Sequence, residues 1–157
     1  MAINIMKSKK YRQSIIPETK TPEYWKNLKG WQLREIAFNT IKQKYAGKAV
    51  INKDFGIPIN ITISSGRKTA FGESIYSKKA AAVLILPEII ANAQYNNWGD
   101  PKPEDGNNLK GYLNFKCKCI IDGKTEHIRL AIQFMKGGKF YYNIEVNKKP
   151  TPERSKA

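Results

Sequence analysis

Residues 112–119 constrain the fold of this chain more than any other segment. In the run Tyr-Leu-Asn-Phe-Lys-Cys-Lys-Cys, polar and apolar side chains alternate, which is the period-two pattern of a half-buried β-strand. Asp122 and Gly123 follow, and this pair favours a two-residue type I′ hairpin turn, because both central positions of that turn need a positive φ. The sequence therefore predicts an antiparallel hairpin around residues 122–123.

The position of this turn fixes the register of the hairpin. If Ile121 and Lys124 flank the turn, three rungs of the core face carry apolar pairs: Cys117 with Ile128, Phe115 with Leu130, and Leu113 with Ile132. The rung beside the turn, Cys119 opposite Glu126, does not match. The two cysteines are predicted to be small core side chains.

The opposite face of the same hairpin is basic. The register places Lys118 opposite His127 and Lys116 opposite Arg129. Like charges that face each other across strands repel by about 0.2–1 kcal/mol per pair. We therefore expect this face to meet an anionic partner.

A second turn, at Gly137 and Gly138, extends the sheet by a third strand. A three-residue loop with a glycine bulge puts four apolar side chains on the core side: Phe134, Tyr142, Ile144 and Val146. Gln133, Tyr141 and Asn143 then join the basic face. A two-residue loop would reverse the assignment of Asn143.

The charge of the chain indicates the same kind of partner. It carries 28 Lys and Arg against 13 Asp and Glu, which gives a formal net charge of +15 in 157 residues. Nucleic acid is the default partner at such a charge. An anionic membrane ranks well below it, because no basic amphipathic helix with a broad apolar face is visible. With one histidine and two cysteines, we expect no zinc site and no cofactor.

The rest of the chain predicts one small domain between two basic tails. Residues 1–22 are expected to form a flexible arm, 23–146 the domain and 147–157 a tail. The predicted elements are a helix over residues 31–45, paired strands at 48–51 and 57–64, helical segments over 78–94 and a loop at 96–110.

Pro87 is expected in the first turn of the second helical segment. Trp25, Trp31 and Trp98 are interpreted as core side chains, although Trp98 lies in a loop where it could be exposed.

A short polar segment after the second predicted strand is a second candidate for phosphate binding. Ser65, Arg67, Lys68 and Thr69 place hydroxyls and two cations beside Gly66. Such a segment can bind phosphate through backbone amides and charge, but it lacks the spacing of a P-loop, and an ordinary solvated turn has the same composition.

The order of these elements and several local strings resemble a known group. The strings are INKDFGIPINITIS, SGRKT, AVLILPEIIANAQY, YLNFKCKCIIDGKTEHIRLAIQF and GKFYYNIEV. They are similar to the phage polyvalent-protein-associated nuclease-like domains of the barnase/EndoU/colicin/RelE superfamily, over about residues 31–146. The strings contain no catalytic signature, so the resemblance bears more on fold than on activity.

The resemblance implies an α+β domain, with N-terminal and central helices packed on a mainly antiparallel twisted sheet and RNA bound on the other face. It also implies metal-independent cleavage of RNA, in which the ribose 2′-hydroxyl attacks the adjacent phosphate. The candidate catalytic residues are His127, Arg129, Lys68 and Lys116. The candidate nucleic-acid-binding residues are Lys118, Arg67, Ser65, Thr69, Gln133 and Asn143.

One departure from the group leaves two functions open. Members often carry a histidine in the last strand, where this chain has Tyr141-Tyr142-Asn143. The first hypothesis is a toxin-like, metal-independent ribonuclease of phage or mobile-element origin. The second is a non-catalytic phage accessory protein that binds nucleic acid or a host or immunity protein. We expect a location in the cytoplasm of a bacterial host cell, with a virion component as the alternative.

Overall fold

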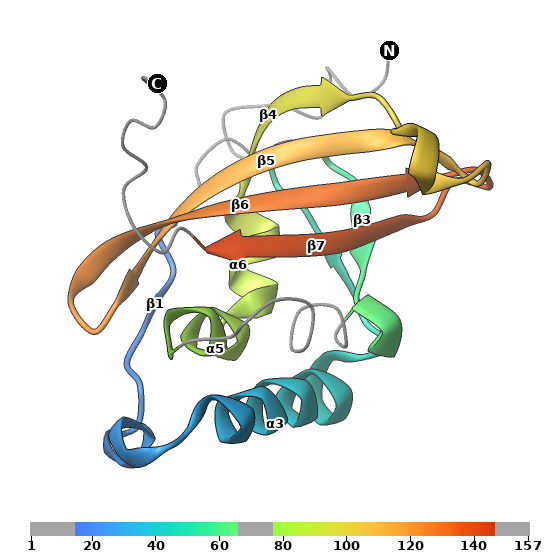
Figure 1. Ribbon diagram of the computed structural model, residues 1–157. Coiled ribbons are helices and arrows are strands. Elements are labelled where there is room, and N and C mark those ends of the chain that lie inside the picture. The colour runs from blue at the N-terminus through green and yellow to red at the C-terminus, as the bar shows by residue number, and fades with distance from the viewer. Residues whose placement is uncertain (1–14, 66–76, 147–157) are drawn as a thin grey trace, which may run out of the picture.

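A computed structural model of the chain describes residues 15–65 and 77–146. Within these ranges the domain is α+β, as the sequence predicts, and its strands form one curled mixed sheet (Figure 1). The strand order is β1-β5-β6-β7-β3-β2, and β4 pairs with β5. The strands are β1 (Glu18–Thr19), β2 (Ala49–Ile51), β3 (Pro58–Asn60), β4 (Gln94–Gly99), β5 (Leu109–Ile121), β6 (Lys124–Met135) and β7 (Phe140–Val146).

The long hairpin of β5 and β6 has the register that its turn predicts. Asp122 and Gly123 have φ values of 51° and 82°, as a type I′ turn requires. Cys117 lies opposite Ile128, and Lys118 lies opposite His127. Alternate side chains of β5 from Leu113 to Ile121 are buried, because every second residue points to the helices. The predicted core and basic faces of this hairpin are both confirmed.

The turn between β6 and β7 is also confirmed as a three-residue loop. The amide of Met135 donates to the carbonyl of Lys139 at 2.9 Å, so residues 136–138 form the loop. Tyr142 and Ile144 are buried, with exposed fractions of 2% and 3%. Asn143 lies opposite Ala131 in the backbone register, and its side chain is outside the described part of the structure.

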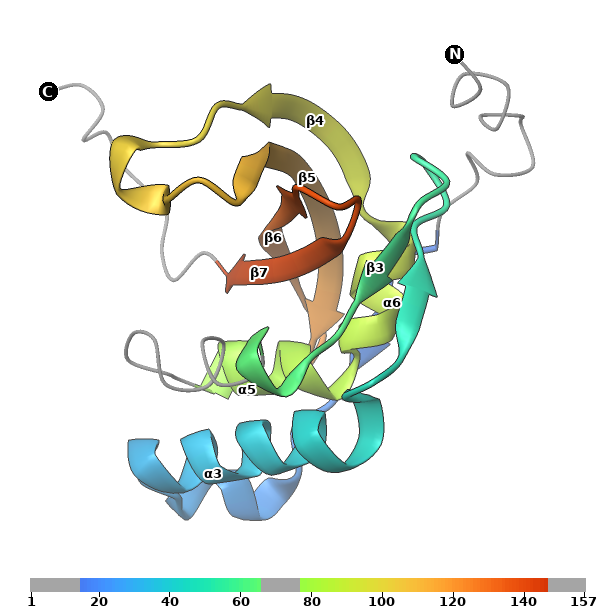
Figure 2. The same ribbon diagram turned by 90° about the vertical axis from the view of Figure 1, so that its right-hand side faces the viewer.

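The helices lie in two levels beneath the sheet (Figures 1 and 2). The helices α5 (Ser77–Leu84) and α6 (Leu86–Asn92) lie nearer the sheet, and α3 (Gly30–Thr40) lies below α5. A π-helical turn, η2 (Ile41–Tyr45), continues α3, and two 3₁₀ turns are η1 (Glu23–Asn27) and η3 (Pro103–Asp105). Pro87 lies in the first turn of α6, as predicted.

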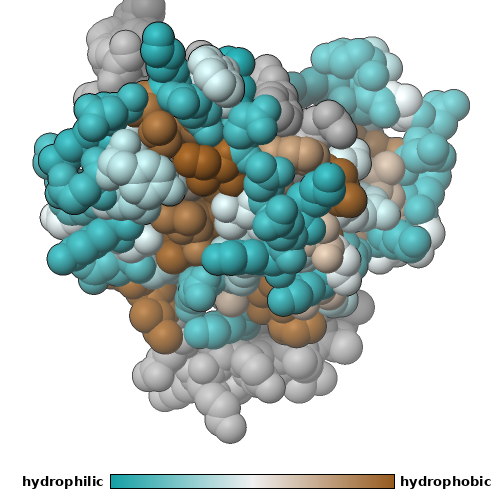
Figure 3. All heavy atoms as spheres, turned by 90° about the horizontal axis from the view of Figure 1, so that it is seen from below, coloured by the Kyte–Doolittle hydropathy of each residue, from teal (hydrophilic) through white to brown (hydrophobic). Residues whose placement is uncertain are grey.

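The predicted burial of the tryptophans is partly wrong. Trp25 is buried, but 59% of Trp31 and 43% of Trp98 are exposed. The buried stripe of the first helix is Leu33, Ala37 and Ile41, and Trp31 lies off this stripe. Figure 3 shows the α3 side of the molecule, where hydrophobic surface lies between hydrophilic side chains.

Two segments that were predicted to be irregular contain strands. The loop predicted at residues 96–110 instead begins with most of β4, which pairs with β5 from Gln94 opposite Lys116 to Gly99 opposite Tyr112. Residues 18–19, placed in the predicted flexible arm, form β1 and pair in parallel with Ile120 and Ile121. Local sequence did not indicate either strand, because each is stabilised by pairing with β5, which lies far along the chain from β1 and across a loop from β4.

No helix among residues 15–65 and 77–146 is both long and apolar enough to cross a membrane.

Candidate nucleic-acid interface

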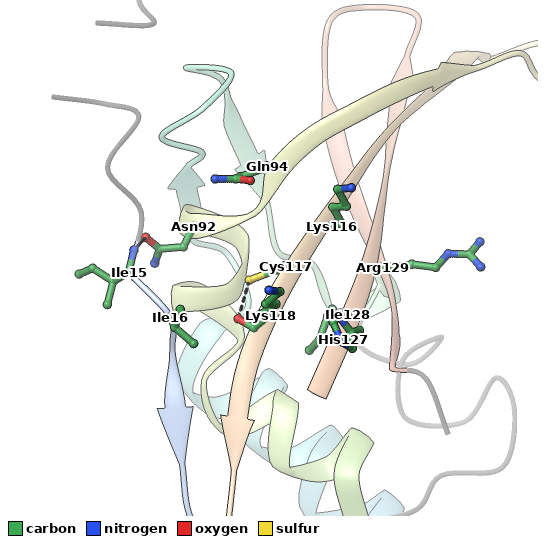
Figure 4. A pocket seen from close by; sticks show the side chains of 10 residues that line it. All are labelled: Ile15, Ile16, Asn92, Gln94, Lys116, Cys117, Lys118, His127, Ile128 and Arg129. Atoms are coloured by element: carbon green, nitrogen blue, oxygen red, sulfur yellow. Dashed lines mark hydrogen bonds between the residues drawn. The ribbon is translucent and has the colours of Figure 1, made fainter. Parts of the chain in front are cut away.

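A groove of about 600 Å³ lies over the basic face of the hairpin (Figure 4). The two cross-strand pairs predicted for that face, Lys116 with Arg129 and Lys118 with His127, both line it. The groove is lined in addition by Ile15, Ile16, Asn92, Gln94, Cys117 and Ile128. Among these lining residues there is no Asp or Glu, so the ionisable groups that face the groove favour an anion.

The groove lies at a gap in the pairing of one β5 edge. On that edge β4 pairs as far as Lys116, and β1 begins opposite Ile120. Residues 117–119 therefore have no strand partner on this edge among the described residues. This gap explains why buried Cys117 and exposed Lys118, which point to opposite faces, line the same groove.

The ladder geometry holds the cationic side chains close together. The amide of Ile120 donates to the carbonyl of Pro17, away from β6, so the rung of Ile120 and Thr125 is a non-hydrogen-bonded pair. Alternation makes the rungs of Lys118 and Lys116 non-hydrogen-bonded pairs too. Such pairs have Cα atoms about 4.5 Å apart, which is closer than hydrogen-bonded pairs. The same alternation directs the backbone N–H of Lys118 into the gap.

The four basic side chains of these rungs lie on the surface. Lys116, Lys118, His127 and Arg129 are all in the exposed class. Lys116 and Lys118 project from β5, and Arg129 projects from β6 away from Ile15 and Asn92, so that it marks the far side of the groove (Figure 4). An extended anion can therefore contact several of them at once.

Asn92 fixes the opposite wall of the groove. Its Oδ1 accepts hydrogen bonds from the backbone N–H of Ile15 and from Lys53 Nζ, each at 2.9 Å. Its Nδ2 donates to the carbonyl of Glu88 at 2.8 Å. Through these bonds the buried Asn92 joins the N-terminal segment to α6. They also bring a further cation, Lys53, beside the groove. The contacts of Asn92 with Lys53 and Ile15 could not be predicted from local sequence, since they join residues 39 and 77 positions apart.

The thiol of Cys117 contributes no ionised group to the groove. Burial raises the pKa of Cys117 to about 12 and that of Cys119 to about 11. The Cys117 Sγ donates to the carbonyl of Lys118 at 3.3 Å. Within residues 15–65 and 77–146, no cluster of three His, Cys, Asp or Glu side chains is arranged to hold a metal ion.

Two of the other predicted site residues, Ser65 and Gln133, do not line this groove. Ser65 is buried, and its hydroxyl lies 2.9 Å from the Thr62 hydroxyl. Gln133 lies four residues beyond Arg129 along β6, which is about 13 Å at the rise of a strand. Arg67, Lys68 and Thr69 lie outside the described residues. Their predicted roles, and that of Asn143, stay predictions.

Comparison with protein families identifies a match over most of this fold. The family large polyvalent protein-associated domain 3 matches residues 31–142, which is more than half of the chain. The chain belongs to this family. Membership in the large polyvalent protein-associated domain 3 family supports the predicted association with polyvalent phage proteins, while the nuclease-like superfamily stays a prediction.

The segment matched to large polyvalent protein-associated domain 3 includes both cationic rungs and α6, whereas Ile15 and Ile16 precede it. Searches of curated proteins and of solved structures returned no match.

Proposed function

We propose that this protein binds the phosphate backbone of a nucleic acid, preferably RNA, in the groove, and that it is a metal-independent ribonuclease. The observation that carries the proposal is the convergence of two cationic rungs, with an imidazole in one of them, on a single groove. Lysine and arginine side chains neutralise phosphates, and imidazole is the side chain that most readily exchanges protons near neutral pH.

The chemistry needs no group outside the chain and the RNA. His127 takes the proton of a ribose 2′-hydroxyl, and the 2′-oxygen attacks the adjacent phosphorus. The bond from phosphorus to the 5′-oxygen breaks, and that oxygen takes a proton from the protonated His127 or from a lysine ammonium of the groove. Lys116 and Arg129 stabilise the negative charge that develops on the phosphate oxygens.

A non-catalytic binder of nucleic acid or of a host or immunity protein is the second candidate. It is favoured by the composition of the described groove, where His127 is the one imidazole and no carboxylate is present to orient it. Under this hypothesis the basic groove contributes affinity and there is no bond cleavage.

Incubation of purified protein with labelled tRNA and other structured RNA in EDTA separates the two candidates. We expect cleavage with 2′,3′-cyclic phosphate ends, lost in His127→Ala while RNA affinity stays within a few-fold of wild type. Thr125→Ala is the matched control, because Thr125 is exposed on the same face of β6 and does not line the groove.

Each result assigns the function differently. RNA that stays intact but shows a band shift would support the non-catalytic binder. Cleavage that persists in His127→Ala would contradict the role of His127. An absence of both cleavage and binding would contradict the nucleic-acid proposal itself.

A further inference from the structure

We propose that the groove holds one unstacked nucleotide of a single strand, with its phosphate on the cationic rungs and its base against Ile15 and Ile16. This inference rests on the proposed binding of nucleic acid and adds the form of the strand and a subsite for the base. It is carried by the chemistry of the wall that faces the cations.

That wall carries two apolar side chains that are open to solvent, beside the polar Asn92. Ile15 and Ile16 are 66% and 52% exposed, and both line the same groove as Lys116 and Lys118. An isolated exposed isoleucine needs no explanation, but two in sequence opposite a cationic floor make an amphipathic site. A nucleotide has matching parts, because its phosphate is anionic and the faces of its base are apolar.

The backbone of the wall is fixed on both sides of the isoleucines. The N–H of Ile15 donates to buried Asn92, and the carbonyl of Pro17 accepts from Ile120 at 2.9 Å. Asn92 is in turn held by the carbonyl of Glu88. A ligand therefore meets a wall that is already ordered, which lowers the entropy lost on binding.

The size and shape of the groove favour a single strand. About 600 Å³ lies in the usual range for sites that enclose small molecules. In a duplex the faces of the bases are stacked and cannot reach an apolar wall, whereas bases of single strands can be splayed out. The backbone N–H of Lys118, directed into the gap between β4 and β1, offers a further donor to the phosphate.

Fluorescence anisotropy with a fully 2′-O-methylated RNA strand tests this subsite without cleavage. The strand is measured alone and annealed to its complement, in EDTA. We expect the single strand to bind about tenfold more tightly than the duplex. Ile15→Ser with Ile16→Ser should weaken single-strand binding about fivefold or more and leave duplex binding unchanged.

The matched control is Ile51→Ser with Ile63→Ser, because these isoleucines are also exposed, at 56% and 46%, and do not line the groove. A second measurement needs no variant: adenosine 3′-monophosphate should displace the labelled strand at lower concentration than inorganic phosphate.

Equal binding of single strand and duplex, equal effects of the two isoleucine variants, or equal competition by phosphate and nucleotide would overturn the base subsite and leave the proposed nucleic-acid function standing. Binding of neither RNA would instead contradict the proposed function. An acidic peptide that displaces the strand more effectively than the nucleotide would assign the groove to a protein partner and overturn the inference.

Discussion

Lys78 at the start of α5 places its Nζ 3.3 Å from Oε2 of Glu126 in β6. This ion pair explains the one rung of the hairpin that lacks an apolar match, Cys119 opposite Glu126. The carboxylate of Glu126 points to the helix side of the sheet, where the residue is 8% exposed. A helix therefore supplies the partner that the strand pattern alone does not contain.

Lys78→Met should destabilise the protein by about 1–3 kcal/mol, because it leaves the Glu126 carboxylate largely buried without its cation. The loss should stay below that of a fully buried pair, since the Lys78 side chain is 39% exposed. Urea unfolding measures the free energy of unfolding. Lys42→Met, at an exposed lysine, is the control. Adding Glu126→Met to Lys78→Met should recover stability, and a further loss would contradict the pairing.

Trp98 and Gly111 form a second contact with a measurable consequence. A Cβ added to Gly111 would lie 2.0 Å from Cζ2 of Trp98, whose Nε1 donates to Asp100 at 2.9 Å. Gly111→Ala should therefore displace the indole and destabilise the fold by about 1–3 kcal/mol. Trp98 fluorescence and thermal unfolding report both effects. In a Trp98→Ala background the same alanine should cost much less, and equal costs in the two backgrounds would argue against the contact.

The hairpin and the groove differ in how far the sequence could predict them. The hairpin register followed from Asp122-Gly123, because a tight turn with one allowed geometry fixes the rungs beyond it, here as far as Gly111 opposite Phe134, after which the register shifts. The cationic half of the groove could be predicted for the same reason. The wall made by Ile15 and Asn92 could not, because it depends on pairing between β1 and β5 and on a side-chain contact 77 residues apart.

The errors at Trp31 and Trp98 have different causes. Trp31 occupies the first turn of α3, two residues before Leu33, and at 3.6 residues per turn it lies about 160° around the helix from that buried side chain. Trp98 was placed in a loop because Asn, Gly and Pro surround it, but the edge of β5 makes that segment a strand.

Asp122 should make the docking of β1 sensitive to acid. The N–H and hydroxyl of Thr21 both donate to its carboxylate at 2.8 Å, and these bonds lower the pKa of Asp122 below its ordinary value. A group with a lowered folded pKa stabilises the protein above the unfolded pKa and loses that contribution as pH falls through the folded pKa. This contribution should therefore begin to decline as pH falls below about 4, and it is lost once pH is below the lowered pKa of folded Asp122.

NMR titration of the Asp122 carboxyl in wild type and Thr21→Val measures that shift. The variant lacks the hydroxyl donor, so the pKa of Asp122 should rise toward its ordinary value. Thr125→Val, at an exposed threonine of β6, should leave it unchanged. An Asp122 pKa that is the same in wild type and Thr21→Val would show that the hydroxyl does not stabilise the carboxylate.

Both cysteines should resist thiol reagents in the folded protein. Burial raises their pKa values to about 12 and about 11, so little thiolate is present at about pH 8. Reaction with a disulfide reagent should be slow in buffer and stoichiometric in denaturant, followed by absorbance. Fast modification of one thiol in buffer would mean that the groove exposes Cys117 to solvent.

RNA binding in the groove is tested by comparing RNA affinity in two double variants that make the same change in net charge. Lys116→Glu with Arg129→Glu changes the groove, and Lys124→Glu with Lys136→Glu changes exposed lysines outside it. The groove variant should weaken binding about tenfold or more and reduce the magnitude of the slope of log affinity against log salt by about two, while the control stays close to wild type. Equal weakening by both variants would contradict RNA binding in the groove, because RNA would then respond to the overall charge of the protein.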